Sequence, residues 1–478
     1  MKIFFAILGL STVALIVWPA SGMAAPLRAG AAAVEITPAP GTPLAGYYNT
    51  RLATTTNDPI SAKAIVIDDG QTQVALVGLD LISTTRPMVE EARRLIHDHT
   101  GIPPGNVMIS ATHCHTAPIL AGSSVRVETQ GGNLPIAAGF MARLPGQIAQ
   151  AVAIAKSNLA PCRIRSGNAL QRSISFNRRF LMKDGSVGWN PGKLNSNIVH
   201  AAGPIDPQVP VVLFESVEKA NTPSAVYVNF SMHPDTVGGV RFSADYPGAL
   251  SRALSEAKGN SLVTLFTIGT AGDLNHVDVT TNAPQKGVEE ATRLGQALTA
   301  PILSLWDTLP LVPLSQLRVK SELVKLALPE ITPAEVEEAR AVALRVTSTN
   351  PPPPFLEQVN AFKVLDVEAR HGEPQEVEVQ VIALGDRIAW VSLPGEIFVE
   401  LGLEIKRRSP FRQTIIAELA NGAIGYIPTR RAYEQGNYEP VSARCAAGSG
   451  ERLVAASLRL LNDLYPAQPA GGEKQSHP

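Results

Sequence analysis

Short apolar runs alternate with polar segments along most of the chain, and their spacing predicts strands and helices in turn. Residues 61–82 hold two β-rich runs around the turn DDGQ, which predicts a hairpin. Residues 86–100 follow with apolar positions at helical spacing. The apolar run at 106–118 then predicts a buried strand. A strand–helix–strand order of this kind indicates an α/β fold.

The same patterns continue to the end of the chain. A short strand is expected in 29–48, and further strands at 225–233, 262–272, 378–395 and 414–422. Further helices are expected at 136–156, 286–305, 333–347, 396–407 and 451–464. The TPAE sequence at 332–335 marks a helix start, with Thr332 as the cap and Glu335 three positions later. We therefore expect one large domain over 26–466, with a helical arm near 325–360.

The two ends of the chain differ from the rest. Residues 1–25 combine Lys2, an apolar run at 3–18 and the small residues GMAA, which predicts a signal peptide cleaved near Ala24 or Ala25. An uncleaved membrane anchor is the alternative, but the run is short for a membrane span. No later run is long enough for a transmembrane helix, so we expect an exported protein, periplasmic or secreted, without an anchor after cleavage. Residues 467–478 are expected to be disordered.

The composition limits the binding partners and the chemistry that the protein can have. The 478 residues are 45% hydrophobic and 17% charged, with a net charge of −1, so a large core is possible and nothing favours nucleic acid. Only three cysteines are present, Cys114, Cys162 and Cys445, and no CxxC pair occurs. A thioredoxin-like redox site is therefore excluded, while one bridge between Cys162 and Cys445 remains open.

Side chains that can bind metals or transfer protons recur where predicted strands end. In ATHCHTAP, His113 and His115 would share one face of the strand, with Cys114 opposite. This pair suits a metal site, or two hydrogen-bonded histidines lining a cleft. The other segments carry His233 in SMHPDT, Asp273 and Asn275 in GDLNH, Glu396 in LPGE, and Tyr426 and Tyr438 in 423–440. Each has a structural explanation of its own: Asp273 as a turn cap, Tyr426 as core, and Glu396 as a partner of its helix dipole.

Five segments in order resemble motifs of the neutral/alkaline ceramidase family of zinc-dependent amide hydrolases. ATHCHTAP is similar to the family's ATHTHSGP, SMHPDT to its histidine–proline segment, and YIPTRRAYEQGNYEPVS to YITTxEEYxxxxYEGAS. LPGE is intact, and NRR at 177–179 matches an asparagine–arginine segment. The similarity spans 29–465. It implies an α/β fold of mixed β-sheets flanked by helices, like the neutral ceramidase catalytic domain.

The resemblance also implies roles for individual residues. It assigns the zinc ligands His113, His233, Glu396 and Tyr426. His115 would lie beside the zinc and contact the substrate or the bound water, Arg178 would line the pocket, and Tyr438 would hydrogen-bond the substrate carbonyl oxygen. The leaving amine needs a proton, and His115 is a candidate donor. Zinc keeps one position open for water in catalytic sites, lowering the water pKa toward ~7, and the hydroxide would attack the acyl carbon. Asp273 is expected to orient a ligand histidine.

Several positions depart from the family. Asn275 stands where the family has a serine, which favours attack by zinc-bound hydroxide over any role for that hydroxyl. The double glycine after THCHTAP is missing, and YEPVS replaces YEGAS. The chain ends soon after a final helix, so we expect the catalytic domain alone, without the immunoglobulin-like domain of typical members.

The function implied is hydrolysis of an N-acyl bond in a small or lipid-like substrate, nominally ceramide to sphingoid base and fatty acid. Another amide or an ester is the alternative substrate. There are two rival interpretations. One is a non-catalytic binding relative, and the other is a structural metal site closed by four protein ligands. A long acyl chain needs an apolar groove, and residues 123–144 are a candidate wall for it, or a surface loop leading into a core helix. The oligomeric state is not indicated.

Overall fold

The largest part of the fold is a mixed sheet of eight strands. The computed structural model describes residues 26–218, 223–313 and 315–466, so the predicted signal peptide and C-terminal tail lie outside the described residues. The pairs β4–β5 and β12–β14 are parallel and the other pairs antiparallel. In spatial order the strands are β14 Val263–Ile268, β12 Pro223–Phe230, β11 Gln208–Ser216, β6 Ala160–Leu170, β1 Arg28–Glu35, β3 Ser61–Asp68, β4 Gln73–Leu79 and β5 Val107–Ala111.

A second sheet of four strands packs against the first. Its order is β16 Leu317–Leu326, β17 Gln375–Leu384, β18 Ile388–Ser392 and β20 Gln413–Ala417. Side chains from both sheets, among them Ile65, Tyr227, Trp390 and Ile415, form one buried core between them. Strands β5, β18 and β20 are buried at every position. Their sequences therefore do not alternate between apolar and polar positions.

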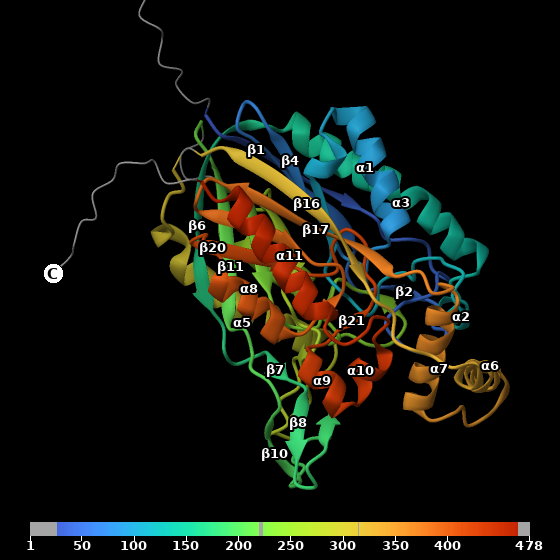
Figure 1. Ribbon diagram of the computed structural model, residues 1–478. Coiled ribbons are helices and arrows are strands. Elements are labelled where there is room, and N and C mark those ends of the chain that lie inside the picture. Colours follow the sequence, from blue (N-terminus) through green and yellow to red (C-terminus); the bar gives the residue numbers. More distant parts are fainter. Residues whose placement is uncertain (1–25, 219–222, 314, 467–478) are drawn as a thin grey trace, which may run out of the picture.

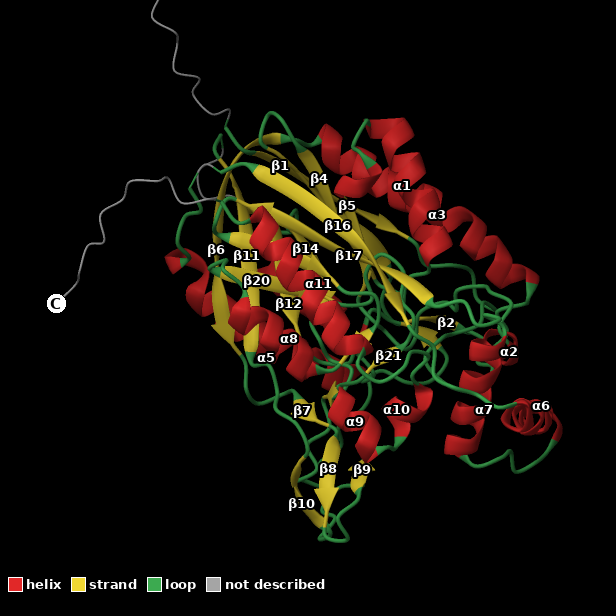
Figure 2. Ribbon diagram, viewed as in Figure 1, coloured by secondary structure: helices red, strands yellow, loops and turns green. Residues whose placement is uncertain are grey.

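Helices cover the outer faces of both sheets, giving four layers (Figures 1 and 2). The large sheet carries α1 Arg86–Thr100, α3 Pro135–Ser157, α4 Asp245–Lys258 and α5 Val288–Leu305. The four-stranded sheet carries α8 Val399–Arg408 and α11 Ser449–Leu464. Each helix buries one apolar side, as in the Met88, Ala92 and Ile96 positions of α1.

Short elements gather at one end of the sheets. The helices α6 Pro333–Ser348 and α7 Phe355–Glu368 project from the body, and α2 Val125–Thr129 lies beside them (Figure 1). A three-stranded sheet forms a second projection, in the order β10 Ile198–Ala201, β8 Arg179–Met182 and β9 Val187–Trp189. The remaining elements are β2 Thr55–Thr56, η1 Pro104–Asn106, β7 Phe176–Asn177, β13 Arg241–Phe242, β15 Leu274–Asn275, η2 Trp306–Thr308, β19 Glu396–Ile397, β21 Tyr426–Ile427, α9 Arg430–Gln435 and α10 Tyr438–Ser442.

Most elements expected from the pattern are present. The hairpin at 61–82 is β3 and β4, and the strand–helix–strand unit is β4, α1 and β5. The capping box is formed, since Thr332 Oγ1 accepts from Glu335 N and the Glu335 carboxylate accepts from Thr332 N. The segment 378–395 holds two strands instead of one. The helices α6 and α7 occupy the predicted arm, although α7 extends to Glu368.

Two boundary predictions were wrong, and both concern candidate site residues. The strand expected over 106–118 ends at Ala111, because His113 adopts a left-handed φ of 74°. The helix expected to begin at Glu396 begins at Val399, because Glu396 pairs with another strand first. Both residues therefore lie outside the regular elements that the pattern predicted for them.

Cys114, Cys162 and Cys445 are buried and unpaired, so the Cys162–Cys445 bridge is not formed. Among the described residues, no helix is both long and apolar enough to cross a membrane.

Candidate metal centre

His113 follows β5 in a strained loop that orients its ring. A left-handed conformation is unfavourable for residues other than glycine, so tertiary contacts must hold it. The backbone N–H of His113 donates to Leu81 O at 2.8 Å, and its Nδ1 lies 2.7 Å from Ile82 O. Because a carbonyl can only accept, Nδ1 carries the proton. The other ring nitrogen, Nε2, therefore offers a lone pair to the interior.

His233 is held in the same tautomer from a different loop. It follows β12, and its Nδ1 lies 2.8 Å from the carbonyl oxygen of Ala271, in the loop after β14. β12 and β14 are parallel neighbours, so the loops that follow them meet at one edge of the sheet. The Nε2 of His233 is thus a second lone pair directed into the same buried space.

Glu396 and Tyr426 are brought side by side by a two-residue parallel ladder between β19 and β21, in which they are direct partners. The Glu396 Oε2 atom lies 3.3 Å from His233 Nε2 and 3.4 Å from His113 Nε2. The Tyr426 hydroxyl contacts the Glu396 carboxylate and accepts a hydrogen bond of 3.1 Å from Arg178 Nη2. All four predicted ligands therefore gather from four separate segments.

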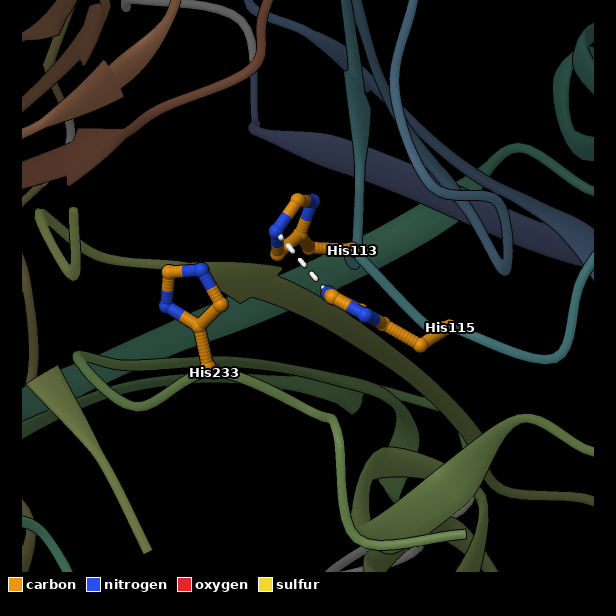
Figure 3. A group of neighbouring side chains, drawn as sticks. All are labelled: His113, His115 and His233. Atoms are coloured by element: carbon orange, nitrogen blue, oxygen red, sulfur yellow. Dashed lines mark hydrogen bonds between the residues drawn. The ribbon is translucent and has the colours of Figure 1, made fainter. Parts of the chain in front are cut away.

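His115 lies beside these residues without a backbone carbonyl to hold its ring. Its Nε2 is 3.3 Å from His113 Nε2 (Figure 3), and its Nδ1 is buried without a hydrogen-bond partner. The nearest carboxylate to Nδ1 is Asp235 Oδ1 at 3.6 Å, which accepts from the Tyr47 hydroxyl at 2.8 Å. Burial lowers the pKa of His115 to about 4, so the ring is neutral at pH 7.

The cluster has the chemistry of a metal site. Two imidazole lone pairs and a carboxylate oxygen face one another at 3.3–3.4 Å, and such acceptors have no proton to share. The ring nitrogens of His113, His115 and His233 lie within 4.8 Å of one another. This buried histidine group could bind a metal ion, and nitrogen with carboxylate oxygen is a donor set that zinc accepts.

Arg178 fastens the tyrosine side of the cluster. Its Nε donates to Glu439 Oε1 at 2.9 Å, and its Nη2 donates to Gly272 O at 2.6 Å as well as to Tyr426. Arg179 donates to the other oxygen of Glu439 at 2.8 Å. Glu439, which is fully buried, was missed by the sequence analysis. In the sequence, only its position next to Tyr438 indicated that Glu439 could belong to the site.

Two cavities meet at the cluster. One of about 730 Å³ and one of about 500 Å³ both reach His115, Tyr426 and Tyr438. Tyr438 begins α10, and its ring centroid lies 5.4 Å from that of Tyr426. Residues 123–127 and Gln130 line the larger cavity, so part of the segment 123–144 does form a wall. A substrate entering either cavity reaches the histidines.

One predicted position differs from expectation. Asp273 does not orient a histidine: its oxygens accept from Asn177 Nδ2 and Val399 N, both at 2.8 Å. The Ala271 carbonyl takes that task for His233. Asn275 donates to Asn190 Oδ1 at 2.9 Å and lines the smaller cavity. Asp235 and Tyr47, which were not predicted, lie closer to the cluster; Asp235 in SMHPDT was the available signal.

The site is a His–Glu–Tyr cluster at the strand ends of a layered α/β fold. Neutral ceramidase from Pseudomonas aeruginosa is similar in structure, with a TM-score of 0.72 and 19% identity over 93% of this chain and 76% of that chain. A ceramidase complexed with C2 gives a TM-score of 0.73 at 19% identity, over 94% of this chain and 77% of the other. No protein-family model matches the chain, and no curated protein matches it significantly. The chain thus has the neutral ceramidase fold.

Proposed function

We propose that this protein is a zinc-dependent hydrolase that cleaves an N-acyl bond. The observation that carries the proposal is the convergence of His113 Nε2, His233 Nε2 and Glu396 Oε2 in one buried space, with the Tyr426 hydroxyl beside them. These four side chains would hold the ion. When bound, zinc supplies a water whose pKa is lowered toward ~7 and polarises an acyl carbonyl.

The chain's own side chains complete the reaction. Tyr438 faces both cavities, and burial raises its pKa well above the usual range, so its hydroxyl stays protonated and can donate to the carbonyl oxygen. His115 is neutral and can take up a proton for transfer to the leaving amine. Arg178 holds the Tyr426 hydroxyl in place.

The smaller cavity supports an apolar, lipid-like portion of the substrate. Its wall includes Tyr48, Trp189, Phe355 and Tyr438, whose rings contact one another at centroid distances of 4.5–5.6 Å. Ceramide, the substrate of the structural neighbours by name, is therefore the first compound to test. Other N-acyl amides, or esters, are the second candidates, because the larger cavity also carries charged side chains.

The test combines metal analysis with hydrolysis. The zinc content of the purified protein is measured by mass spectrometry, together with turnover of fluorescent ceramide, simple N-acyl amides and esters. We expect one zinc per chain and amide hydrolysis, with both lost in His113→Ala and both kept in His200→Ala, which changes an exposed histidine outside the cluster. Zinc without turnover of any compound would favour a binding protein. Turnover by metal-free protein would refute the proposal.

Export stays a prediction from residues 1–25, and fractionation of cells that produce the full chain tests it.

A further inference from the structure

The wall of the larger cavity contains four arginines and, apart from Glu396, two carboxylates. Three of the four arginines are matched by fixed partners. These pairs are Arg444 Nε with Asp366 at 2.7 Å, Arg340 Nη2 with Glu368 at 2.6 Å, and Arg370 with the carbonyls of Glu373 and Pro374 at 2.9 and 2.7 Å. Arg126 is the exception, since no carboxylate or carbonyl of the described residues hydrogen-bonds its guanidinium.

Arg126 lines the same cavity as His113, His115 and Glu396. It lies on α2, with its Cζ 4.9 Å from the ring centroid of Tyr48. Tyr48 in turn packs edge-on against Phe355 and stacks on Phe362 of α7, so the guanidinium rests on a built surface. The Arg126 guanidinium therefore lines a cavity that also reaches the proposed metal site.

The same segment carries a second unmatched donor. Gln130 is four positions after Arg126, directly beyond the end of α2, and lines the same cavity. The side chain is only 4% exposed, and its Nε2 has no hydrogen-bond partner. A buried amide donor without an acceptor is unfavourable, so such a group indicates that a ligand supplies the acceptor. A guanidinium and an amide together offer N–H groups of the kind that a carboxylate accepts.

We propose that Arg126 and Gln130 bind a carboxylate on the amine portion of the substrate, so that the preferred substrates are N-acyl amino acids. This inference rests on the proposed N-acyl hydrolysis. The acyl chain lies along the aromatic wall of the smaller cavity, and the amino-acid portion lies in the larger one. Water adds its oxygen to the acyl carbon, the C–N bond breaks, and the nitrogen takes a proton. The products are a fatty acid and a free amino acid.

Two compounds that share the acyl chain and the scissile bond test the assignment. N-octanoylglycine carries the carboxylate, and N-octanoylglycinamide is its neutral counterpart. We expect the wild type to have a kcat/KM at least ~10-fold higher for the acid. Arg126→Gln should lower this acid-to-amide ratio by about 10- to 100-fold, the range for a hydrogen bond to a charged group. Gln130→Leu should lower the ratio by a smaller factor.

Arg340→Gln is the matched control, because it removes a guanidinium from the same wall whose partner is already Glu368. The acid-to-amide ratio should stay within about twofold of the wild type. A wild-type enzyme that cleaves both compounds equally, or prefers the neutral one, overturns the carboxylate site and leaves the hydrolase intact.

Calorimetry separates this failure from failure of the hydrolase itself. The acid should bind more tightly than the amide to the wild type, and the difference should disappear in Arg126→Gln. That result supports the carboxylate site even where neither compound is cleaved. Equal affinities in the wild type overturn the inference.

Discussion

Two buried polar clusters flank Tyr426, and they are built on opposite principles. In one, Glu439 accepts from both Arg178 and Arg179, so every charge has a partner of the opposite sign. In the other, Glu396 faces the Nε2 atoms of His113 and His233, whose protons are held on the far side of each ring by carbonyl oxygens. The charges of the first cluster are paired by residues of the chain itself. The second cluster consists of acceptors that face one another.

The difference shows what each cluster contributes. A buried, hydrogen-bonded ion pair stabilises the folded protein only while both partners are present. Converging lone pairs repel one another and gain most when a cation is bound. We therefore expect substitutions in the Glu439 cluster to lower the free energy of unfolding, and substitutions in the Glu396 cluster to remove metal and activity.

The largest expected effect is that of Glu396→Gln. The amide keeps the shape of the side chain but removes the negative charge that a zinc ion needs. Zinc binding should be lost, and N-acyl hydrolysis should fall by about 10⁴-fold, equal to ~5.5 kcal/mol in the activation barrier. Metal analysis and kcat/KM measure the two effects.

Glu418→Gln is the matched control. Glu418 is fully buried, its Oε2 accepts from Ile397 N, and burial raises its pKa well above the usual range, which favours the neutral acid. Zinc content should be unchanged in this variant. Loss of zinc in both variants would mean that substituting either buried carboxyl group disrupts the site. Zinc binding would then not depend specifically on the Glu396 carboxylate.

Glu439→Gln tests the complete cluster. The neutral amide leaves two buried guanidinium groups without a carboxylate to pair with. The free energy of unfolding should therefore fall by about 3–4 kcal/mol. Urea denaturation measures the change. Glu404→Gln is the control, because Glu404 also bridges two arginines, Arg407 and Arg408, at the exposed face of α8. It should cost no more than about 0.5 kcal/mol; equal losses would contradict the importance of burial.

Tyr438→Phe addresses the group proposed to contact the substrate. Removing one donor to the carbonyl oxygen should lower kcat by about 10²-fold, or ~2.7 kcal/mol, with zinc content unchanged. In Tyr433→Phe, the lost hydroxyl donates to Cys445 O away from both cavities, so kcat should stay near that of the wild type. A Tyr438→Phe variant with full kcat removes the residue from the mechanism.

Zinc addition should give the smallest effect. At a free zinc concentration ten times Kd, binding to the folded state alone raises the free energy of unfolding by about 1.4 kcal/mol. Thermal denaturation of chelator-treated wild type with and without zinc measures the shift, and Glu396→Gln should show none. An equal shift in that variant would place the stabilising zinc elsewhere.

The sequence anticipated much of the architecture. The hairpin of β3 and β4, the unit β4–α1–β5 and the capped start of α6 all follow from local periodicity and capping chemistry. The resemblance also selected four residues that the fold brings together. It assigned no role to Asp235 or Glu439, although both lie inside quoted motifs, and none to Arg126 and Gln130, which lie in no quoted motif.

The errors fell where tertiary contacts override local preference. The apolar pattern around His113 continues beyond Ala111, but contacts with Leu81 and Ile82 force the backbone into a left-handed turn. Glu396 precedes a helix, yet pairing with Tyr426 makes it a strand residue. Asp273 has a carboxylate that can accept from a histidine, but its oxygens accept from Asn177 Nδ2 and Val399 N instead.

The sequence by itself determined the elements and the residue types of the site, because periodicity, capping and strand-end polarity are local properties of the chain. The tertiary structure alone decided which lone pairs converge, which carboxylates are already neutralised, and which donors are left without acceptors. These properties depend on atoms that are close in space but more than a hundred residues apart in sequence, such as His113 and Glu396, so no local pattern encodes them.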